Sequence, residues 1–181
     1  MPEIIHAAPV TPRPQLAVTA QGLIAETFER GSIVGGSIST AQQVRGSMLG
    51  LRAGDVVTNL HADLIVAGVG AGYARMALCS LAGVQLGLSG DANAAFTGAA
   101  GLLTIQLATP YTALVDVGFY VCTLSNLATT QPSFGRGSTS VGTDVGIGSG
   151  SARNVFQNSQ ASFPSSATFS ALTVTYWFGV S

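Results

Sequence analysis

His61 and Asp63 are the residues whose types and spacing come closest to a chemical site. They stand two positions apart, so an extended strand places both on one face. There a carboxylate can orient an imidazole or share a metal ion with it. The other histidine is His6, so a serine hydrolase would have to use His61 as its base. A solvated polar pair on the outer sheet face, or a pair at a subunit contact, explains the same spacing without chemistry, and we expect this.

Paired carboxylates, as in glycosidases, would have to be brought together from distant parts of the chain. Asp91 follows Gly90 and Asp55 follows Gly54, which is typical of turns. We therefore expect the aspartates to be turn and surface residues. The five candidates are Asp55, Asp63, Asp91, Asp116 and Asp144.

The remaining candidates for chemistry are isolated in the sequence. Cys79 and Cys122 lack further ligands at zinc spacing and are expected to be buried free thiols, with a disulfide as the alternative. The glycine clusters at 68–72 and 146–150 lack the spacing of a phosphate-binding loop and indicate turns or loops. Tyr73, Tyr111, Tyr120 and Trp177 could stack on a sugar ring, but we expect core or interface packing. No catalytic, cofactor-binding or metal-binding residue is assigned, and no cofactor is expected.

The elements that carry these residues are predicted to be strands. Apolar residues alternate with polar ones at period two. Within 56–66 the pattern puts Val56 with Leu60 on one face and Val57 with His61 on the other. The predicted strands cover 56–66, 73–80, 84–88, 103–107, 115–124 and about 168–180. A short helix over 23–30, a loop or helical turn around Phe96, an edge segment over 111–114 and a long Gly/Ser-rich exposed loop near 133–153 complete the prediction.

These elements predict an all-β fold, a β-sandwich of jelly-roll-like topology, preceded by an extended proline-rich arm. A flattened barrel gives nearly the same alternation, and the pattern does not fix the strand order. Prolines 2, 9, 12 and 14 favour extended backbone in residues 1–22. We expect residues 1–45 to form the arm and a short connecting segment, and residues 46–181 to form the sandwich domain.

The composition favours assembly with other proteins. Hydrophobic residues make up 47% of the chain and charged residues only 8%, against about 25% in soluble domains. A surface so poor in charge suggests coverage by partners. The formal net charge of -1, with seven arginines and no lysine, argues against nucleic-acid binding. No secretory signal is visible, and the apolar stretch 64–74 is too short to span a membrane.

Two blocks of sequence resemble a known family. Residues 49–55 (LGLRAGD), leading into a strand, and residues 73–83 (YARMALCSLAG) resemble β-sandwich domains of tailed-bacteriophage virion proteins. Residues 101–107 (GLLTIQL), 110–112 (PYT) and 118–121 (GFYV) resemble the second half of such domains in fibres, head decorations and minor tail proteins. The resemblance covers roughly residues 46–137, and its motifs are structural, so no functional residue is transferred.

The resemblance implies a structural protein of a phage virion that assembles as a homo-oligomer, such as a trimer, and docks to capsid or tail proteins. The proline-rich arm, with Pro9, Pro12, Arg13 and Pro14, would then be the attachment segment. Two alternatives stay open. One is a carbohydrate-binding module that attaches to a host-surface glycan, and the other is a hydrolase built on the same sandwich.

Overall fold

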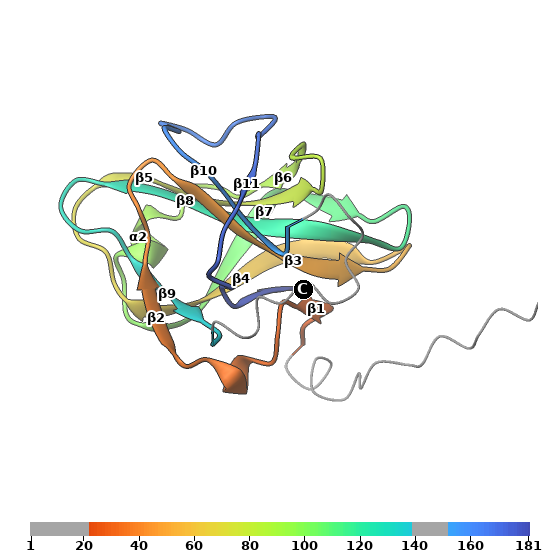
Figure 1. Cartoon of the computed structure of the whole chain (residues 1–181), viewed down its shortest axis with the longest axis horizontal. Coiled ribbons are helices and arrows are strands. Elements are labelled where there is room, and N and C mark those ends of the chain that lie inside the picture. The colour runs from red at the N-terminus through yellow and green to blue at the C-terminus, as the bar shows by residue number, and fades with distance from the viewer. Residues whose placement is uncertain (1–21, 139–151) are drawn as a thin grey trace, which may run out of the picture.

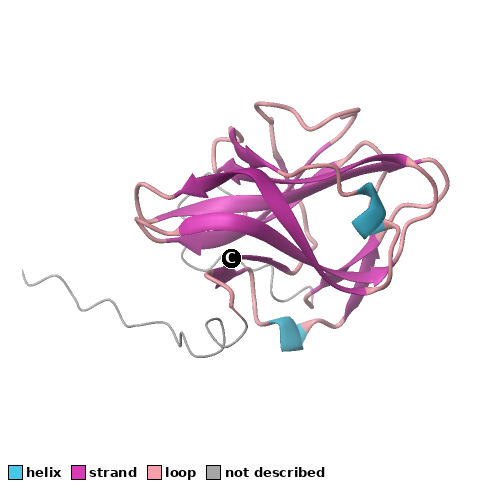
Figure 2. Cartoon of the chain, turned by 180° about the vertical axis from the view of Figure 1, so that it is seen from behind, coloured by secondary structure: helices cyan, strands magenta, loops and turns pink. Residues whose placement is uncertain are grey.

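The protein is an all-β sandwich of two antiparallel sheets. The structure, a computed structural model, describes residues 22–138 and 152–181. Figure 2 shows that strands dominate, with two short helical turns, the 3₁₀ helix η1 (Arg30–Ser32) and α2 (Asn93–Phe96). No helix in these ranges is long and apolar enough to cross a membrane.

The first sheet, sheet A, is organised around β4, which pairs with strands along both of its edges. β7 pairs with one edge, whereas β12 and β9 pair with successive parts of the other. β1 extends the sheet beyond β12, and β2 extends it beyond β9. Its strands are β1 (Ala25–Glu26), β12 (Phe178–Val180), β4 (Val56–Val66), β9 (Ser133–Arg136), β2 (Gly35–Ile38) and β7 (Gly101–Thr112).

The second sheet, sheet B, is a simple antiparallel ladder. In spatial order its strands are β11 (Ser170–Ala171), β10 (Asn154–Gln157), β3 (Val44–Leu51), β8 (Val117–Leu127), β5 (Gly72–Ser80) and β6 (Gln85–Leu88). A bridge between Ser89 and Leu107 brings the β6 side of sheet B next to β7 of sheet A. Residue 46, where we expected the sandwich domain to begin, lies inside β3. β1 and β2 come before it in the chain and belong to sheet A.

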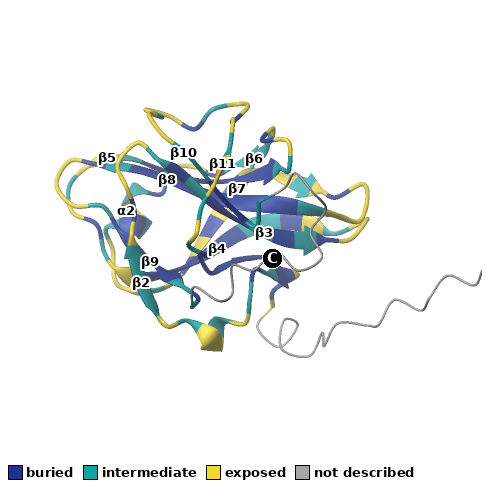
Figure 3. Cartoon of the chain, viewed as in Figure 1, coloured by how far each residue is buried: buried dark blue, intermediate teal, exposed yellow. Residues whose placement is uncertain are grey.

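Sheet B is covered by apolar side chains on both faces. Its inner face packs on sheet A through a core that includes Met76, Leu78 and Val121. A second cluster, which includes Tyr120, Cys122 and Phe163, lies on its outer face. The segment between β10 and β11 supplies Phe163 to this cluster, and Figures 1 and 3 show that segment over the sheet. The largely buried 115–124 strand expected from the sequence is confirmed as β8.

One irregularity in the pairing of β4 with β7 departs from the sequence pattern in two ways. The register of these strands shifts between Val57 and Asn59, so Val57 joins Leu60 in the core and Val56 is exposed. The faces predicted for these two valines were therefore wrong. The strand expected over 103–107 and part of the edge segment expected over 111–114 form one strand that continues to Thr112, because Pro110 lies where the ladder is interrupted and needs no N–H donor.

Three further expectations were wrong. Residues 23–30 do not form a helix, since Ala25 and Glu26 pair with β12. The long exposed loop expected near 133–153 instead begins with buried strand β9, and its residues 139–151 lie outside the described ranges. The expected strand 168–180 is divided into β11 and β12, because its first part pairs with β10 in sheet B and its last part with β4 in sheet A.

Candidate functional site

The His61–Asp63 pair lies on the outer face of sheet A, but the expectation of a solvated pair was wrong, because both side chains are buried. The expectation that they share a face is confirmed, since the alternate residues Leu60, Ala62 and Leu64 lie in the core between the sheets. The two residues do not act on each other, because each has its own set of partners from distant parts of the chain.

Asp63 belongs to an ion pair with Arg30 of η1. Arg30 donates to Asp63 Oδ1 from Nε at 3.1 Å and from Nη2 at 2.5 Å. The same guanidinium lies over the ring of Trp177, 5.7 Å from the ring centroid, and the Trp177 Nε1–H donates to Glu26 Oε2 at 3.0 Å. This arrangement compensates buried charge and fixes the η1 segment on the sheet. It leaves Asp63 with no free role as a base.

The His61 ring is held between two hydroxyl groups. Thr104 Oγ1 lies 3.1 Å from Nδ1, and Ser181 Oγ lies 2.9 Å from Nε2. Burial lowers the pKa of His61 below its ordinary value, and a hydrogen bond with the Leu103 backbone opposes this effect. In a serine triad a carboxylate orients the imidazole and stabilises its charged form. Here Thr104 occupies that position, so the arrangement is suited to a neutral, structural imidazole.

The described aspartates, apart from Asp63, accept hydrogen bonds from turn backbones. Asp55 Oδ2 accepts from the N–H of Arg52 at 2.7 Å, and Asp116 Oδ1 accepts from Ala53 at 2.7 Å. Asp91 Oδ1 accepts from Asn93 N–H at 3.1 Å. The expected turn roles of Asp55 and Asp91 are confirmed. Asp144, His6 and the arm residues Pro9, Pro12, Arg13 and Pro14 lie outside the described residues.

Cys79 and Cys122 are buried free thiols on adjacent strands, as expected. Burial raises the pKa of Cys122 well above its ordinary value, and contact with Cys79 adds to this. Such thiols are poor nucleophiles. Within residues 22–138 and 152–181 no three His, Cys, Asp or Glu side chains form a group that could hold a metal ion.

The four aromatic residues considered for sugar stacking are packed against the protein. Trp177 and Tyr120 are almost fully buried. The Tyr73 hydroxyl accepts a hydrogen bond from the Phe163 N–H at 2.9 Å, and the ring of Tyr111 packs edge-on against Phe119. Tyr73 and Tyr111 are partly buried by these contacts, in agreement with the expected packing role.

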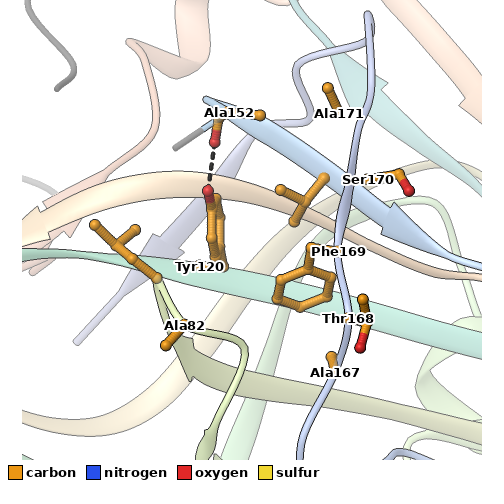
Figure 4. Close-up of a pocket in the computed structure, with 10 residues that line it drawn as sticks. Ala82, Tyr120, Ala152, Ala167, Thr168, Phe169, Ser170 and Ala171 are labelled. Carbon is orange, nitrogen blue, oxygen red and sulfur yellow. Dashed lines mark hydrogen bonds between the residues drawn. The ribbon is translucent and has the colours of Figure 1, made fainter. Parts of the chain in front are cut away.

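A hollow of about 450 Å³ lies on the outer face of sheet B. The rings of Tyr120 and Phe169 line it (Figure 4). They are in edge-to-face contact, with 5.4 Å between their centroids. The Tyr120 hydroxyl donates to the carbonyl oxygen of Ala152. We call this hollow the groove. Its lining contains no charged residue and consists of Leu81, Ala82, Tyr120, Ala152, Val155, Ala167, Thr168, Phe169, Ser170 and Ala171.

An exposed apolar tip lies at the end of the sandwich where the 52–55 and 113–116 turns meet, at the right of Figure 1. Leu114 is 82% exposed and Val115 is 61% exposed. Hydrogen bonds from Gly54 N–H to Ala113 O at 2.8 Å and from Ala113 N–H to Asp55 O at 2.9 Å join the two turns. We call Leu114 and Val115 the knob, because a fixed frame holds them in solvent.

Sequence reasoning missed both of these surfaces. The knob has a visible signal, since two consecutive large apolar residues occupy a turn that should be polar. The groove has none, because its lining comes from turns and strands between Leu81 and Ala171 that only the fold brings together.

Comparison with known proteins gives no relative from which a function could be transferred. The chain matches no protein-family model, no curated protein and no solved structure.

Proposed function

We infer that this protein is a non-enzymatic structural protein that works by assembling with other copies of itself. The observation that carries this proposal is the exposed apolar surface of the described residues, combined with a chain that is only 8% charged. The exposed large apolar residues are Ile24, Val34, Ile38, Val56, Ile65, Val66, Val69, Val84, Leu102, Leu114, Val115 and Val117.

Six of these residues gather in two places, where a partner could cover several of them together. Val56 and Val117 flank the knob, because Val56 pairs with Thr112 and Val117 pairs with Leu51 at the same end of the sandwich. Ile38 and Val66 both pair with Ser133 on sheet A. Clustered apolar exposure of this kind is typical of interaction surfaces, whereas isolated exposed residues need no explanation.

The titratable groups support a structural role over catalysis. Catalytic sites keep an acid, a base or a nucleophile available to substrate. Here Asp63 is bound by Arg30, and His61 is enclosed by Thr104 and Ser181. Cys122 has a raised pKa and no exposure. These roles require a rigid framework and no bound substrate.

The virion of a tailed phage is the setting that the sequence resemblance over residues 46–137 supports. In that setting the assembled sandwich forms part of the particle surface, and the arm with Pro9 and Arg13 attaches it to a capsid or tail protein. The resemblance supports the setting, whereas the surface of the sandwich supports self-assembly, so the two parts of the proposal can be tested separately.

Self-assembly is tested by sedimentation velocity and light scattering on the full-length protein, from micromolar to submillimolar concentration. We expect a defined oligomer at the upper end of this range. The same measurement on a chain lacking residues 1–21 should give the same oligomer if the sandwich itself assembles. A monomer at every concentration would overturn the proposal and favour a binding module for a separate ligand, such as a host glycan.

A further inference from the structure

We propose that the knob of one copy inserts into the groove of a second copy, and that two such contacts form a closed two-fold dimer. This inference rests on the proposed self-assembly and specifies the surfaces that carry it. It is argued from the size, charge and relative position of the knob and the groove.

The knob is suited to insertion because its frame is already ordered. Besides the two backbone hydrogen bonds between its turns, Asp116 Oδ1 accepts from Ala53 N–H at 2.7 Å. Asp55 accepts from Arg52 N–H, so both carboxylates at this end are engaged within the turns. A pre-ordered apolar tip binds with a small loss of conformational entropy.

The groove is large enough for the knob and its lining is uncharged. A cavity of about 150 Å³ can hold a benzene ring, so a hollow of about 450 Å³ has room for the side chains of Leu114 and Val115. None of its lining residues carries a charge, so the knob would bury no unpaired ion there. The partly exposed Phe169 ring offers apolar surface to an entering side chain.

Backbone hydrogen bonds also hold the wall of the groove next to Ala167 in place. The Ala167 N–H donates a hydrogen bond to the Gly83 carbonyl oxygen at 2.9 Å. Gln85 N–H donates to Ser165 O at 3.0 Å, which fixes the segment before Ala167 against β6. The groove is therefore present before a partner arrives, and association needs little rearrangement.

The two features lie at the same end of the molecule, which favours a reciprocal contact. Val117 at the base of the knob and Tyr120 in the groove are three residues apart on β8, about 10 Å along a strand. Leu81 of the groove also lies against Gly118. Two adjacent complementary patches can be satisfied together by a two-fold axis, and a two-fold dimer is the commonest closed assembly.

The test uses full-length variants in sedimentation velocity, with Trp177 fluorescence as a check of folding. The knob variant is Leu114→Ser with Val115→Ser, and the groove variant is Ala82→Arg at an exposed position of the lining. Leu102→Ser and Ala108→Arg are matched controls, because both residues are exposed on β7, outside the knob and the groove. We expect the knob and groove variants each to weaken dimerisation about tenfold or more, and the controls to leave it unchanged.

Mixing the two variants gives the decisive result. Each variant alone has no intact knob–groove pair, whereas a mixed dimer has one, formed by the knob of the groove variant and the groove of the knob variant. Association restored on mixing supports the proposal. If neither variant weakens dimerisation relative to the wild type, or if mixing the two variants restores no association, the proposal is overturned. Self-assembly would then use another surface. A wild-type protein that stays monomeric at all concentrations would overturn both proposals. In that case, binding to phosphatidylcholine vesicles by the wild type but not by the knob variant would assign the knob to a lipid surface.

Discussion

Arg30 lies over the ring of Trp177, 5.7 Å from the ring centroid, while its guanidinium binds the carboxylate of Asp63. One arginine therefore joins the η1 segment to two strands of sheet A, because Asp63 belongs to β4 and Trp177 directly precedes β12. Trp177 is the only tryptophan of the chain and is fully buried, so its fluorescence reports on this contact directly.

Arg30→Ala should lower the free energy of unfolding by about 1–3 kcal/mol, because it leaves the Asp63 carboxylate buried without its cation. Asp63→Asn should cost less, since it removes the charge that needs compensation. The double variant should then be more stable than the sum of the two losses implies. Urea unfolding followed by Trp177 fluorescence measures all three. Additive losses would show that the ion pair makes no net contribution.

The stability of the protein should fall as the pH decreases below about 6.5 because of His61. Burial lowers the pKa of His61 in the folded state, so below the ordinary histidine pKa the unfolded chain binds the proton more readily than the folded protein does. The loss continues down to the folded-state pKa and then levels off. His61→Gln should lack this part of the pH dependence. The difference between the two urea-midpoint profiles from pH 8 to pH 5 isolates His61, and identical profiles would contradict this assignment.

Gly83→Ala should be among the most damaging single substitutions on sheet B. Gly83 has a φ of +83°, and a Cβ there would lie 2.0 Å from the carbonyl oxygen of Ala167. We expect a loss of about 3 kcal/mol or more, from backbone strain and the clash together. Gly54→Ala is the matched control, because Gly54 has a φ of +91° but open space around it, so strain alone should cost it about 1 kcal/mol. Equal melting-temperature shifts would refute the clash.

Gly46→Ala should be destabilising because of Cys122 on the neighbouring strand. A Cβ at Gly46 would lie 2.5 Å from Cys122 Sγ, and relieving such overpacking costs about 1–3 kcal/mol. In a Cys122→Ala background the same substitution should cost less, since the sulfur is gone. A double-mutant cycle in urea gives this coupling energy, and a value near zero would place the strain at the Val121 carbonyl or Val155 instead.

Both thiols should be protected from reagents in the folded protein. Cys79 and Cys122 are fully buried, and the pKa of Cys122 is raised, so the reactive thiolate is scarce and inaccessible. With 5,5′-dithiobis(2-nitrobenzoic acid) we expect negligible colour in native buffer and reaction of both cysteines in denaturant. Rapid labelling without denaturant would show that the cover formed by the β10–β11 segment opens readily.

The sequence pattern predicted the regular strands well because their alternation directly reflects burial. Ala74, Met76 and Leu78 share the core face of β5, which is the arrangement that the alternation over 73–80 predicts. The failures have local causes that the pattern cannot encode. The register shift near Val57 changed the faces of two valines, and Pro110 was accommodated in an irregular ladder. The apolar run 168–180 was divided because its two ends pair with different sheets.

The candidate sites were predictable only where the residues are neighbours in sequence. The shared face of His61 and Asp63 follows from their spacing of two. Their partners do not, because Arg30 is 33 residues from Asp63 and Ser181 is 120 residues from His61. The turn roles of Asp55 and Asp91 were predictable, since a carboxylate next to a glycine caps its own turn.

The pairing of β1 with β12 has a consequence for the order in which the protein is built. Ala25 emerges from the ribosome about 150 residues before its partner Val180, which at roughly 5–20 residues per second is a wait of roughly 8 to 30 seconds. During that interval β1 has no strand to pair with, and the β4 edge at Leu60 and His61 is open to other chains. Sheet A is completed only when residues 178–180 add β12 between β1 and β4. Mispairing between nascent copies is therefore most favoured during synthesis, when several chains grow close together on one polysome.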